Sequence, residues 1–265
     1  MKKIILFLLL TSALTSFGQN YIIEASGIQI GKVICFLKLS ANNYLIGSDN
    51  GLFSYSQGNV AAVLPAAIHG VSDMAVDNGG SVWLATLNVG LVKMNSNGTS
   101  IVQAWNPANS VLPYSLKHIE IDPSYGIWIG SDQAIWLMNG VQFTEYSFLS
   151  GSILPGVKDI LNYGGQTFFL MKDSICLFNG SGFPGINQGQ FASLSATGSG
   201  EIFTCTDSLI YKYNGTAFIC DTALSAGCNF NIIYMSKHEV FDFLKTGNEY
   251  YIFSPNYVMI TNNSA

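Results

Sequence analysis

Short apolar segments alternate with polar turns along most of the chain. The clearest example is the apolar segment Ile127–Ile129, which is followed by the polar turn Gly130–Ala134 and by a second apolar segment, Ile135–Met138. Apolar runs of this length, bounded by Gly, Asn, Asp and Ser, are typical of β-strands joined by tight turns. The pattern therefore predicts an all-β protein.

This unit recurs along the chain: an aromatic or aliphatic strand, a polar turn, a second strand and often the dipeptide Asn-Gly. Six copies follow one another at a period of about 40 residues. Their equivalent anchor residues are Leu45, Trp83, Trp128, Phe168, Phe203 and Tyr251. A short apolar segment precedes each anchor strand and another follows in most copies, so each copy predicts four strands. Four short strands at this period are typical of a propeller blade, and we predict an all-β β-propeller with six four-stranded blades.

The two ends of the chain predict how this propeller closes. The last copy ends after its third strand, whereas the apolar segment Tyr21–Ala25 precedes the first copy. A three-stranded blade would expose an unpaired strand edge. We therefore predict that Tyr21–Ala25 lies antiparallel beside Val258–Thr261 and completes the last blade.

The first eighteen residues have the pattern of a secretory signal peptide. Lys2 and Lys3 precede the apolar run Ile4–Leu10, and the small residues Ser16 and Gly18 follow. Such a run is too short for a membrane-spanning helix, which needs about 20 residues, although a permanent anchor is the alternative. We expect residues 1–18 to be removed, residues 19–265 to form a single β-propeller domain, and the protein to be periplasmic or secreted with no membrane span after removal of the signal.

Composition excludes several classes of protein. The chain is 49% hydrophobic, which is too apolar for a disordered chain. Its net charge of −5 argues against a nucleic-acid partner. All 11 basic residues are lysines, so the chain lacks the arginine side chain that usually holds phosphate or carboxylate groups with two parallel hydrogen bonds.

The five cysteines leave their pairing open. An oxidising compartment permits disulfides, and Cys220 and Cys228 are the candidate pair because a short flexible stretch separates them. The alternative is that all five are small buried apolar residues. No Cys or His spacing is typical of a zinc site, and we predict neither a metal site nor a cofactor.

One segment resembles a known repeat. Ser110–Asp122 followed by Gly126–Ser131 has a Leu-Pro entry, an apolar strand that ends in Asp, and then Trp-Ile-Gly-Ser. This order resembles the two-component regulator propeller repeat, and partial copies begin at Leu64 and Leu154. The resemblance implies a β-propeller fold and a role as an extracytoplasmic sensor or an envelope protein, as in the exported propellers of Bacteroidetes.

Candidate binding residues lie at the longer connections between copies, where the sequence departs from the repeat. They are the aromatic residues Trp105, Tyr114 and Phe148 and the histidines His69 and His118. For each aromatic residue the alternative is that it packs a loop onto the sheet. The histidines share no motif, and we predict no catalytic residue.

These observations predict an exported, non-catalytic recognition or scaffold module that binds a protein or glycan through the loops between blades. One alternative is an extracytoplasmic sensor propeller of a two-component regulator system, separated from its signalling domains. The other is a propeller-type lyase or hydrolase. The identity of the ligand and the oligomeric state stay open.

Overall fold

The computed structural model describes most of the chain between residues 24 and 262. The described ranges are 24–25, 28–31, 33–40, 43–56, 59–64, 68–146, 156–192, 194–196, 201–206, 209–222, 242–246, 249–254 and 257–262. Residues 1–149 and residues 150–265 form two compact units, which we describe one at a time. The elements assigned in both units are strands, which confirms the all-β prediction. None of the described segments is a helix long and apolar enough to cross a membrane.

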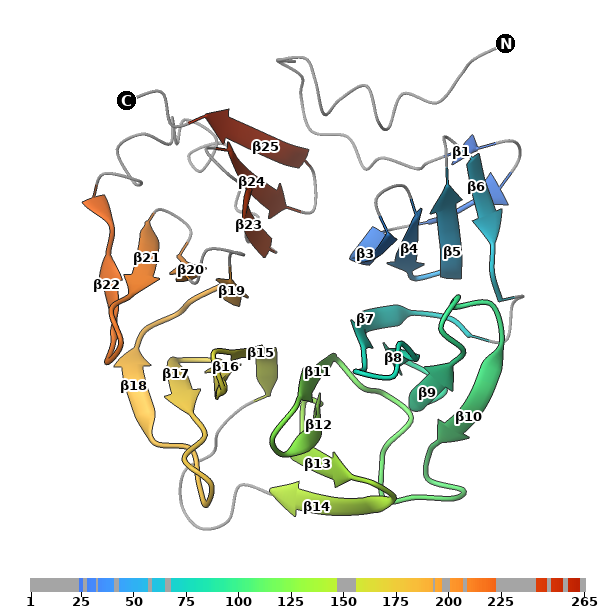
Figure 1. Cartoon of the computed structure of the whole chain (residues 1–265), viewed down its shortest axis with the longest axis horizontal. Helices are drawn as coiled ribbons and strands as arrows, with labels where there is room; N and C mark the ends of the chain where they lie inside the picture. The colour runs from blue at the N-terminus through green and yellow to red at the C-terminus, as the bar shows by residue number, and fades with distance from the viewer. Residues whose placement is uncertain are drawn as a thin grey trace. The chain divides into compact units, whose positions relative to one another are not determined.

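Three four-stranded antiparallel sheets make up most of residues 1–149 (Figure 1). The first sheet contains β3 (Val33–Ser40), β4 (Asn43–Ser48), β5 (Gly51–Ser56) and β6 (Asn59–Ala62). The second contains β7 (Val71–Val76), β8 (Val82–Thr86), β9 (Leu91–Met94) and β10 (Ile101–Trp105). The third contains β11 (His118–Asp122), β12 (Gly126–Gly130), β13 (Ile135–Asn139) and β14 (Gln142–Tyr146). Strands pair in chain order within each sheet.

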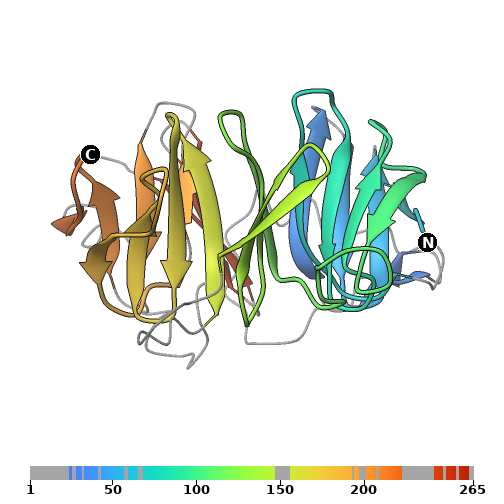
Figure 2. The same cartoon turned by 90° about the horizontal axis from the view of Figure 1, so that it is seen from below.

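Residues 150–265 contain three more antiparallel sheets, whose up-and-down strands Figure 2 shows from the side. One contains β15 (Val157–Tyr163), β16 (Gln166–Met171), β17 (Ser174–Leu177) and β18 (Gly185–Gln188). The next contains β19 (Leu194–Ala196), β20 (Ile202–Cys205), β21 (Ile210–Tyr213) and β22 (Phe218–Cys220). The last described sheet contains β23 (Asp242–Thr246), β24 (Glu249–Ser254) and β25 (Tyr257–Asn262).

The anchors of the six predicted copies all lie in the second strand of a sheet. Leu45, Trp83, Trp128, Phe168 and Phe203 have exposed fractions of 4% or less. Alternate side chains of a strand point to opposite faces, so in these five sheets the face that carries the anchor is the one turned into the core. The period read from the sequence therefore corresponds to one sheet for each copy.

The predicted closure by Tyr21–Ala25 is not confirmed. Its described part is β1 (Glu24–Ala25), which pairs with β2 (Ile28–Gln29) in a separate two-stranded sheet. Residues 21–23 and the predicted signal peptide lie outside the described residues. A hairpin to the adjacent segment closes a very short loop, which costs less chain entropy than pairing with a distant strand. Among the described strands, the last sheet has three.

Apolar residues from neighbouring sheets form the core of each unit. In residues 1–149, one cluster joins Trp83 and Leu91 of the second sheet to Ile129 and Trp136 of the third. In residues 150–265, Phe168, Leu170 and Ile175 pack with Leu194, Ile202 and Phe218. The faces of the sheets are therefore buried against each other, while polar residues occupy the turns.

In two of the sheets, an aspartate carboxylate accepts a hydrogen bond from the indole of the anchor tryptophan. The Trp83 indole N–H donates to Asp77 Oδ2 at 2.8 Å, and the Trp128 indole N–H donates to Asp122 Oδ2 at 3.2 Å. The other oxygen of each carboxylate accepts backbone N–H groups of the turn, from Gly79 and Ser81 in the first case. Each aspartate thus fixes both the turn and the tryptophan that follows six residues later. In both sheets an aspartate at the end of the first strand, or directly after it, accepts the indole N–H of the tryptophan in the second strand. This hydrogen bond explains why Asp and Trp recur at this spacing.

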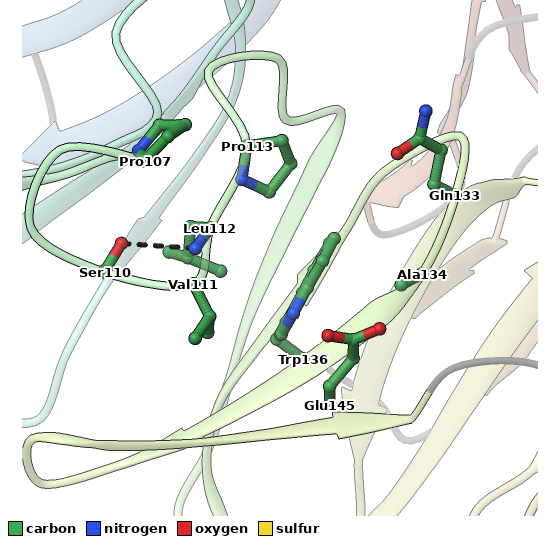
Figure 3. A pocket seen from close by; sticks show the side chains of 9 residues that line it. All are labelled: Pro107, Ser110, Val111, Leu112, Pro113, Gln133, Ala134, Trp136 and Glu145. Atoms are coloured by element: carbon green, nitrogen blue, oxygen red, sulfur yellow. Dashed lines mark hydrogen bonds between the residues drawn. The ribbon is translucent and has the colours of Figure 1, made fainter.

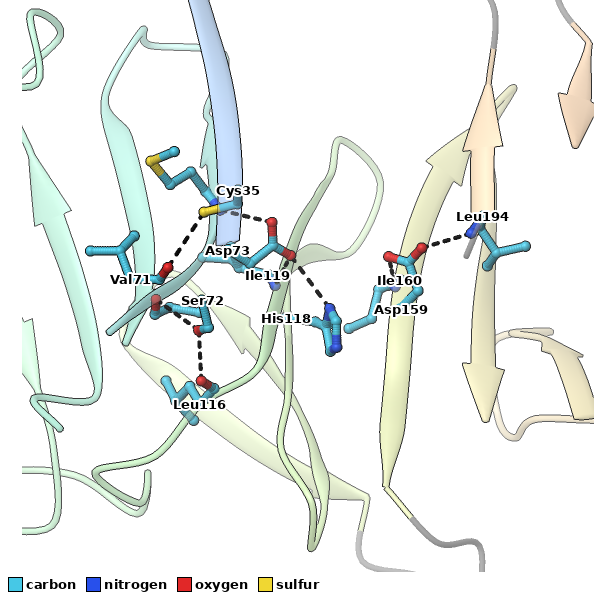
Figure 4. Close-up of polar contacts among 12 residues, drawn as sticks. Cys35, Val71, Ser72, Asp73, Leu116, His118, Ile119, Asp159, Ile160 and Leu194 are labelled. Atoms are coloured by element: carbon cyan, nitrogen blue, oxygen red, sulfur yellow. Dashed lines mark hydrogen bonds and ion pairs between the residues drawn. The ribbon is translucent and has the colours of Figure 1, made fainter. Parts of the chain in front are cut away.

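The first strands of neighbouring sheets are joined by side chains at one recurrent position (Figure 4). In β7 and β15 a register shift precedes Asp73 and Asp159. Asp73 Oδ2 accepts the Ile119 N–H of β11 at 3.0 Å, and Asp159 Oδ2 accepts the Leu194 N–H of β19 at 2.7 Å. A register shift also precedes Cys35 in β3, and its thiol donates to the Val71 carbonyl of β7 at 3.6 Å.

The thiol of Cys35 is suited to this donor role because it stays protonated. Burial, followed by the negative charge of Asp73, raises the pKa of Cys35 well above its ordinary value. A carboxylate at the same position accepts from an N–H of the next sheet, whereas a thiol donates to a carbonyl. Both therefore satisfy a backbone group at an otherwise unpaired strand edge.

Replacing Asp73 or Asp159 by asparagine tests these links between sheets. The amide keeps one oxygen but turns an NH₂ group toward a backbone N–H, so we expect each variant to lose about 1–2 kcal/mol of the free energy of unfolding. The control is Asp132→Asn, which removes an exposed surface ion pair with Lys117 and should cost less than about 0.5 kcal/mol. Urea unfolding measures all three, and equal costs for Asp73→Asn and Asp132→Asn would contradict the links.

The lowered pKa of Asp77 predicts how the free energy of unfolding changes at acidic pH. Burial acts to raise the pKa of Asp77, but the hydrogen bonds from Trp83, Ser81 and Gly79 and the charge of Lys93 outweigh it and hold the pKa below its ordinary value. A carboxyl whose pKa is lowered by folding stabilises the protein above its unfolded-state pKa, near 4. That contribution is lost as the pH falls through the lower, folded-state pKa.

We therefore expect Asp77→Asn to lose less stability than the unchanged protein between about pH 5 and pH 2. The measurement is the midpoint of urea unfolding at each pH. Asp173→Asn is the control for the removal of one exposed carboxylate elsewhere. Parallel pH curves for the unchanged protein and Asp77→Asn would show that this carboxylate does not carry the effect.

Candidate functional site

A pocket of about 310 Å³ opens in residues 1–149, between a connection and the third sheet (Figure 3). The connection between β10 and β11 supplies one wall, and β13, β14 and the turn before β13 supply the other. The lining residues are Pro107, Ser110, Val111, Leu112 and Pro113 on the first wall and Gln133, Ala134, Trp136 and Glu145 on the second. Two of the predicted binding residues, Trp105 and Tyr114, lie directly before this connection and within it.

Local hydrogen bonds fix the shape of the first wall. The carbonyl of Asn106 accepts from the N–H and the hydroxyl of Ser110 at 2.8 and 3.0 Å. The same hydroxyl then accepts from the Leu112 N–H at 3.2 Å. Leu112 and Leu116 are fully buried in the core, and the Leu116 N–H donates to the Thr86 carbonyl. The wall is therefore held at both ends. Val111, which lies between these ends, is 61% exposed and lines the pocket.

The second wall rests on the strand pair β13–β14. Trp136 and Glu145 lie directly opposite each other in the register of this pair. The hydroxyl of Ser131 accepts from the N–H groups of Gln133 and Ala134 at 3.0 and 3.2 Å. This turn carries Gln133 and Ala134 on the same side of the pocket as Trp136 (Figure 3).

The indole N–H of Trp136 sets this pocket apart. Trp136 is 4% exposed, and its Nε1 is the buried side-chain nitrogen or oxygen that has no hydrogen-bond partner among the described residues. The corresponding groups of Trp83 and Trp128 donate to aspartates. An unsatisfied buried donor costs roughly 1–3 kcal/mol, so the pocket contains a group that gains from an acceptor brought by another molecule.

The charge at the mouth is negative. Glu145 is exposed and forms no ion pair with any residue that the structure describes. No lysine or histidine lines the pocket. The pocket therefore combines a carboxylate acceptor and a buried N–H donor with apolar contacts from Pro107, Val111 and Pro113, and such a mixture of polar and apolar groups is common in ligand sites.

The four predicted binding residues that the structure describes lie outside the lining of this pocket. Trp105 is 8% exposed and stacks on Trp83, with ring centroids 5.4 Å apart and an interplanar angle of 16°. Tyr114 is 51% exposed and directly follows the pocket wall, where its carbonyl accepts the Gly90 N–H at 2.9 Å. None of the predicted residues lines the pocket itself, and Phe148 lies outside the described residues.

Of the two histidines, His69 lies in the connection between β6 and β7, whereas His118 is the first residue of β11. His69 is exposed, and its backbone N–H donates to Asn88 Oδ1 at 3.2 Å. His118 begins β11, where its Nδ1 lies 3.7 Å from Asp73 Oδ2 (Figure 4). Within the described residues, no group of three or more His, Cys, Asp or Glu side chains is arranged to hold a metal ion. Cys220 lies in β22, but Cys228 is outside the described residues, so their pairing stays a prediction.

Sequence reasoning missed Trp136, Gln133 and Glu145. A signal for Trp136 was present, because Trp83 and Trp128 each have an aspartate six residues before them, whereas Trp136 has Gly130 there. A buried tryptophan without that acceptor is a candidate for an unpaired indole. Glu145 had no such signal, since its position opposite Trp136 depends on strand register.

No family model matches the chain, and no curated protein sequence matches it. Solved structures do. The extracellular domain of BT4673 from Bacteroides thetaiotaomicron, described as a one component system and also as a hybrid two component system, is similar with a TM-score of 0.71 and 13% identity. The match covers 93% of this chain and 34% of that one.

The extracellular domain of BT3049, a hybrid two component system of the same organism, is similar with a TM-score of 0.62 and 15% identity, over 91% of this chain and 40% of that one. The chain thus spans well under half the length of these two proteins. A catalytically inactive virginiamycin B lyase from Staphylococcus aureus, solved with quinupristin, gives a TM-score of 0.64 at 12% identity, over 88% of this chain and 80% of that one.

The fold is a β-propeller. Similarities at these identities establish the fold alone. The predicted resemblance to two-component regulator propellers is confirmed by the Bacteroides extracellular domains. The six-blade count, the closure and the single-domain boundary of the propeller stay predictions.

Two substitutions separate residues that hold the propeller together from residues that are available to a ligand. Because Trp105 is buried and stacked, we expect Trp105→Ala to lower the free energy of unfolding by about 3–5 kcal/mol. Because half of the Tyr114 side chain is exposed, Tyr114→Ala should cost about 1 kcal/mol or less. Urea unfolding monitored by circular dichroism measures both, and equal costs would contradict the assignment of Trp105 to the core.

Proposed function

We propose that this propeller is an extracytoplasmic recognition module of the sensor type, which binds a ligand in the pocket between the β10–β11 connection and β13–β14. The observation that carries the proposal is the pocket itself, which is lined by Trp136, whose buried indole N–H has no partner among the described residues. The similarity to extracellular domains of regulator systems supports the sensor setting. The signal-like residues 1–18 support export.

Hydrogen bonds at Asn106 and Ser131 hold the backbone of the two walls before a ligand arrives. Binding therefore orders little backbone, and the rearrangement it requires is limited to the side chains that cover the Trp136 N–H. The ligand then gains from the unpaired N–H of Trp136 and from apolar contact with Val111. Binding free energy is thus available to shift an equilibrium elsewhere in a larger assembly.

A second candidate is a propeller lyase or hydrolase. The observation that favours it is the similarity to a virginiamycin B lyase, whose structure was solved with quinupristin. A chemical step would consume the ligand, whereas recognition alone leaves it intact. Mass spectrometry of the ligand after incubation with the protein separates these two functions.

Thermal unfolding in the presence of two ligand classes tests the main proposal. We expect either capped peptides or neutral oligosaccharides such as maltoheptaose and xylohexaose to raise the melting temperature. A ligand at 100 times its Kd adds about 2.7 kcal/mol, which corresponds to a shift of roughly 5–10 °C for a chain of this size. Val111→Asp should abolish the shift, and Asp173→Asn, a change outside the pocket, should retain it.

Two results would contradict this function. If neither class stabilises the protein, the pocket does not serve recognition of such ligands. If Val111→Asp shows the full shift, the ligand binds elsewhere. Consumption of a stabilising ligand would favour the enzyme candidate instead.

A further inference from the structure

We infer that the pocket takes an extended peptide segment, with a main-chain carbonyl bonded to Trp136 and a lysine side chain directed at Glu145. This inference rests on the proposed function and names the ligand class of the same site. Three features of the pocket carry it: the Trp136 N–H, which has no partner among the described residues; the Glu145 carboxylate, which has no ion pair among them; and the apolar contacts that Pro107, Val111 and Pro113 offer.

The donor requires an acceptor from the ligand. Trp136 Nε1 is buried and can only donate. An ammonium group or a second N–H leaves it unsatisfied, whereas each residue of a peptide offers one carbonyl oxygen. Because the nitrogen is covered in the free protein, the ligand must displace the side chains that cover it. Glu145 lies opposite Trp136 across the strand pair and is exposed, so its side chain is free to turn outward.

Charge at the mouth favours a cation on the ligand. Glu145 has no ion pair among the described residues, and no basic side chain lines the pocket. The chain as a whole carries a net charge of −5. An anionic ligand would meet an uncompensated carboxylate, whereas a lysine ammonium bound there gains a charge-assisted hydrogen bond.

The walls favour a peptide over a sugar. Trp136 is the aromatic residue among the lining residues, and at 4% exposed its ring faces are already buried in the core. The pocket therefore presents no open aromatic face on which a sugar ring could stack. Pro107, Val111 and Pro113 offer aliphatic contact instead, which suits small apolar side chains and the methylene stem of lysine.

The experiment uses fluorescein-labelled capped peptides that differ only at the central residue. The parent is Gly-Val-Ala-Lys-Ala-Val-Gly, and norleucine or glutamate replaces the lysine in the two comparison peptides. Fluorescence polarisation gives Kd for each peptide at low and high salt. We expect the lysine peptide to bind most tightly, the norleucine peptide about 3-fold more weakly, and the glutamate peptide more weakly still.

Variants then assign the contacts. Glu145→Gln should weaken the lysine peptide about 3-fold, remove its salt dependence and leave the norleucine peptide unchanged. Asp173→Asn removes the same charge outside the pocket and should change neither peptide. Val111→Ser and Trp136→Phe should weaken both peptides without altering the salt dependence. Thermal unfolding checks that each variant is folded. If Trp136→Phe does not fold, Val111→Ser alone tests whether both peptides bind in the pocket.

The outcomes distinguish a failure of the peptide inference from a failure of the proposed recognition function. Equal affinity for the lysine and glutamate peptides, or an unchanged Kd in Glu145→Gln, would overturn the peptide inference. If a neutral oligosaccharide binds and Val111→Asp abolishes that binding while no peptide binds, the inference fails and the recognition function stands. If neither class binds at all, both fail.

Discussion

A buried indole N–H must find an acceptor, and this constraint organises much of the propeller. Trp83 and Trp128 meet this requirement in the same way, by donating to an aspartate at the end of the preceding strand or directly after it. The bond closes the turn, fixes the second strand against the first and turns the indole into the core between sheets. Trp136 faces the same requirement without the aspartate, and its N–H borders a pocket. Trp136, which lacks the aspartate that Trp83 and Trp128 have, is therefore the tryptophan whose N–H is available to a ligand.

A second constraint concerns the edges of the sheets. The first strand of one sheet contacts the first strand of the next, as with β7 and β11 or β15 and β19. Such edges carry backbone groups that no ladder satisfies. Asp73 and Asp159 accept N–H groups there, and Cys35 at the equivalent position donates to a carbonyl. A register shift before each of these residues sets the side chain toward its neighbour. Each unit is thus held by repeated polar links as well as by apolar packing.

Much of this architecture could be predicted from the sequence, because it depends on a repeated local pattern. The six anchors, the order of the strands and the use of one sheet for each copy all follow from hydrophobic spacing and turn residues. The links between sheets and the pocket depend on which residues become neighbours across strands and connections, and no local pattern encodes that. Trp105 illustrates the limit, since its place beside a long connection indicates exposure, yet the ring stacks on Trp83. The pairing of Glu24–Ala25 with Ile28–Gln29 likewise reflects a local hairpin that competes with a distant strand.

The hydrogen-bond state of the tryptophan indoles in the ligand-free protein tests this account most directly. Spectra of protein labelled with ¹⁵N at tryptophan resolve the indole N–H groups, and single Trp→Phe substitutions assign them. We expect the indole protons of Trp83 and Trp128 to resonate downfield, because each is bonded to a carboxylate, and the indole proton of Trp136 to resonate upfield of both. A Trp136 proton already in the downfield, hydrogen-bonded position, or an unbonded Trp83 and Trp128, would contradict this expectation.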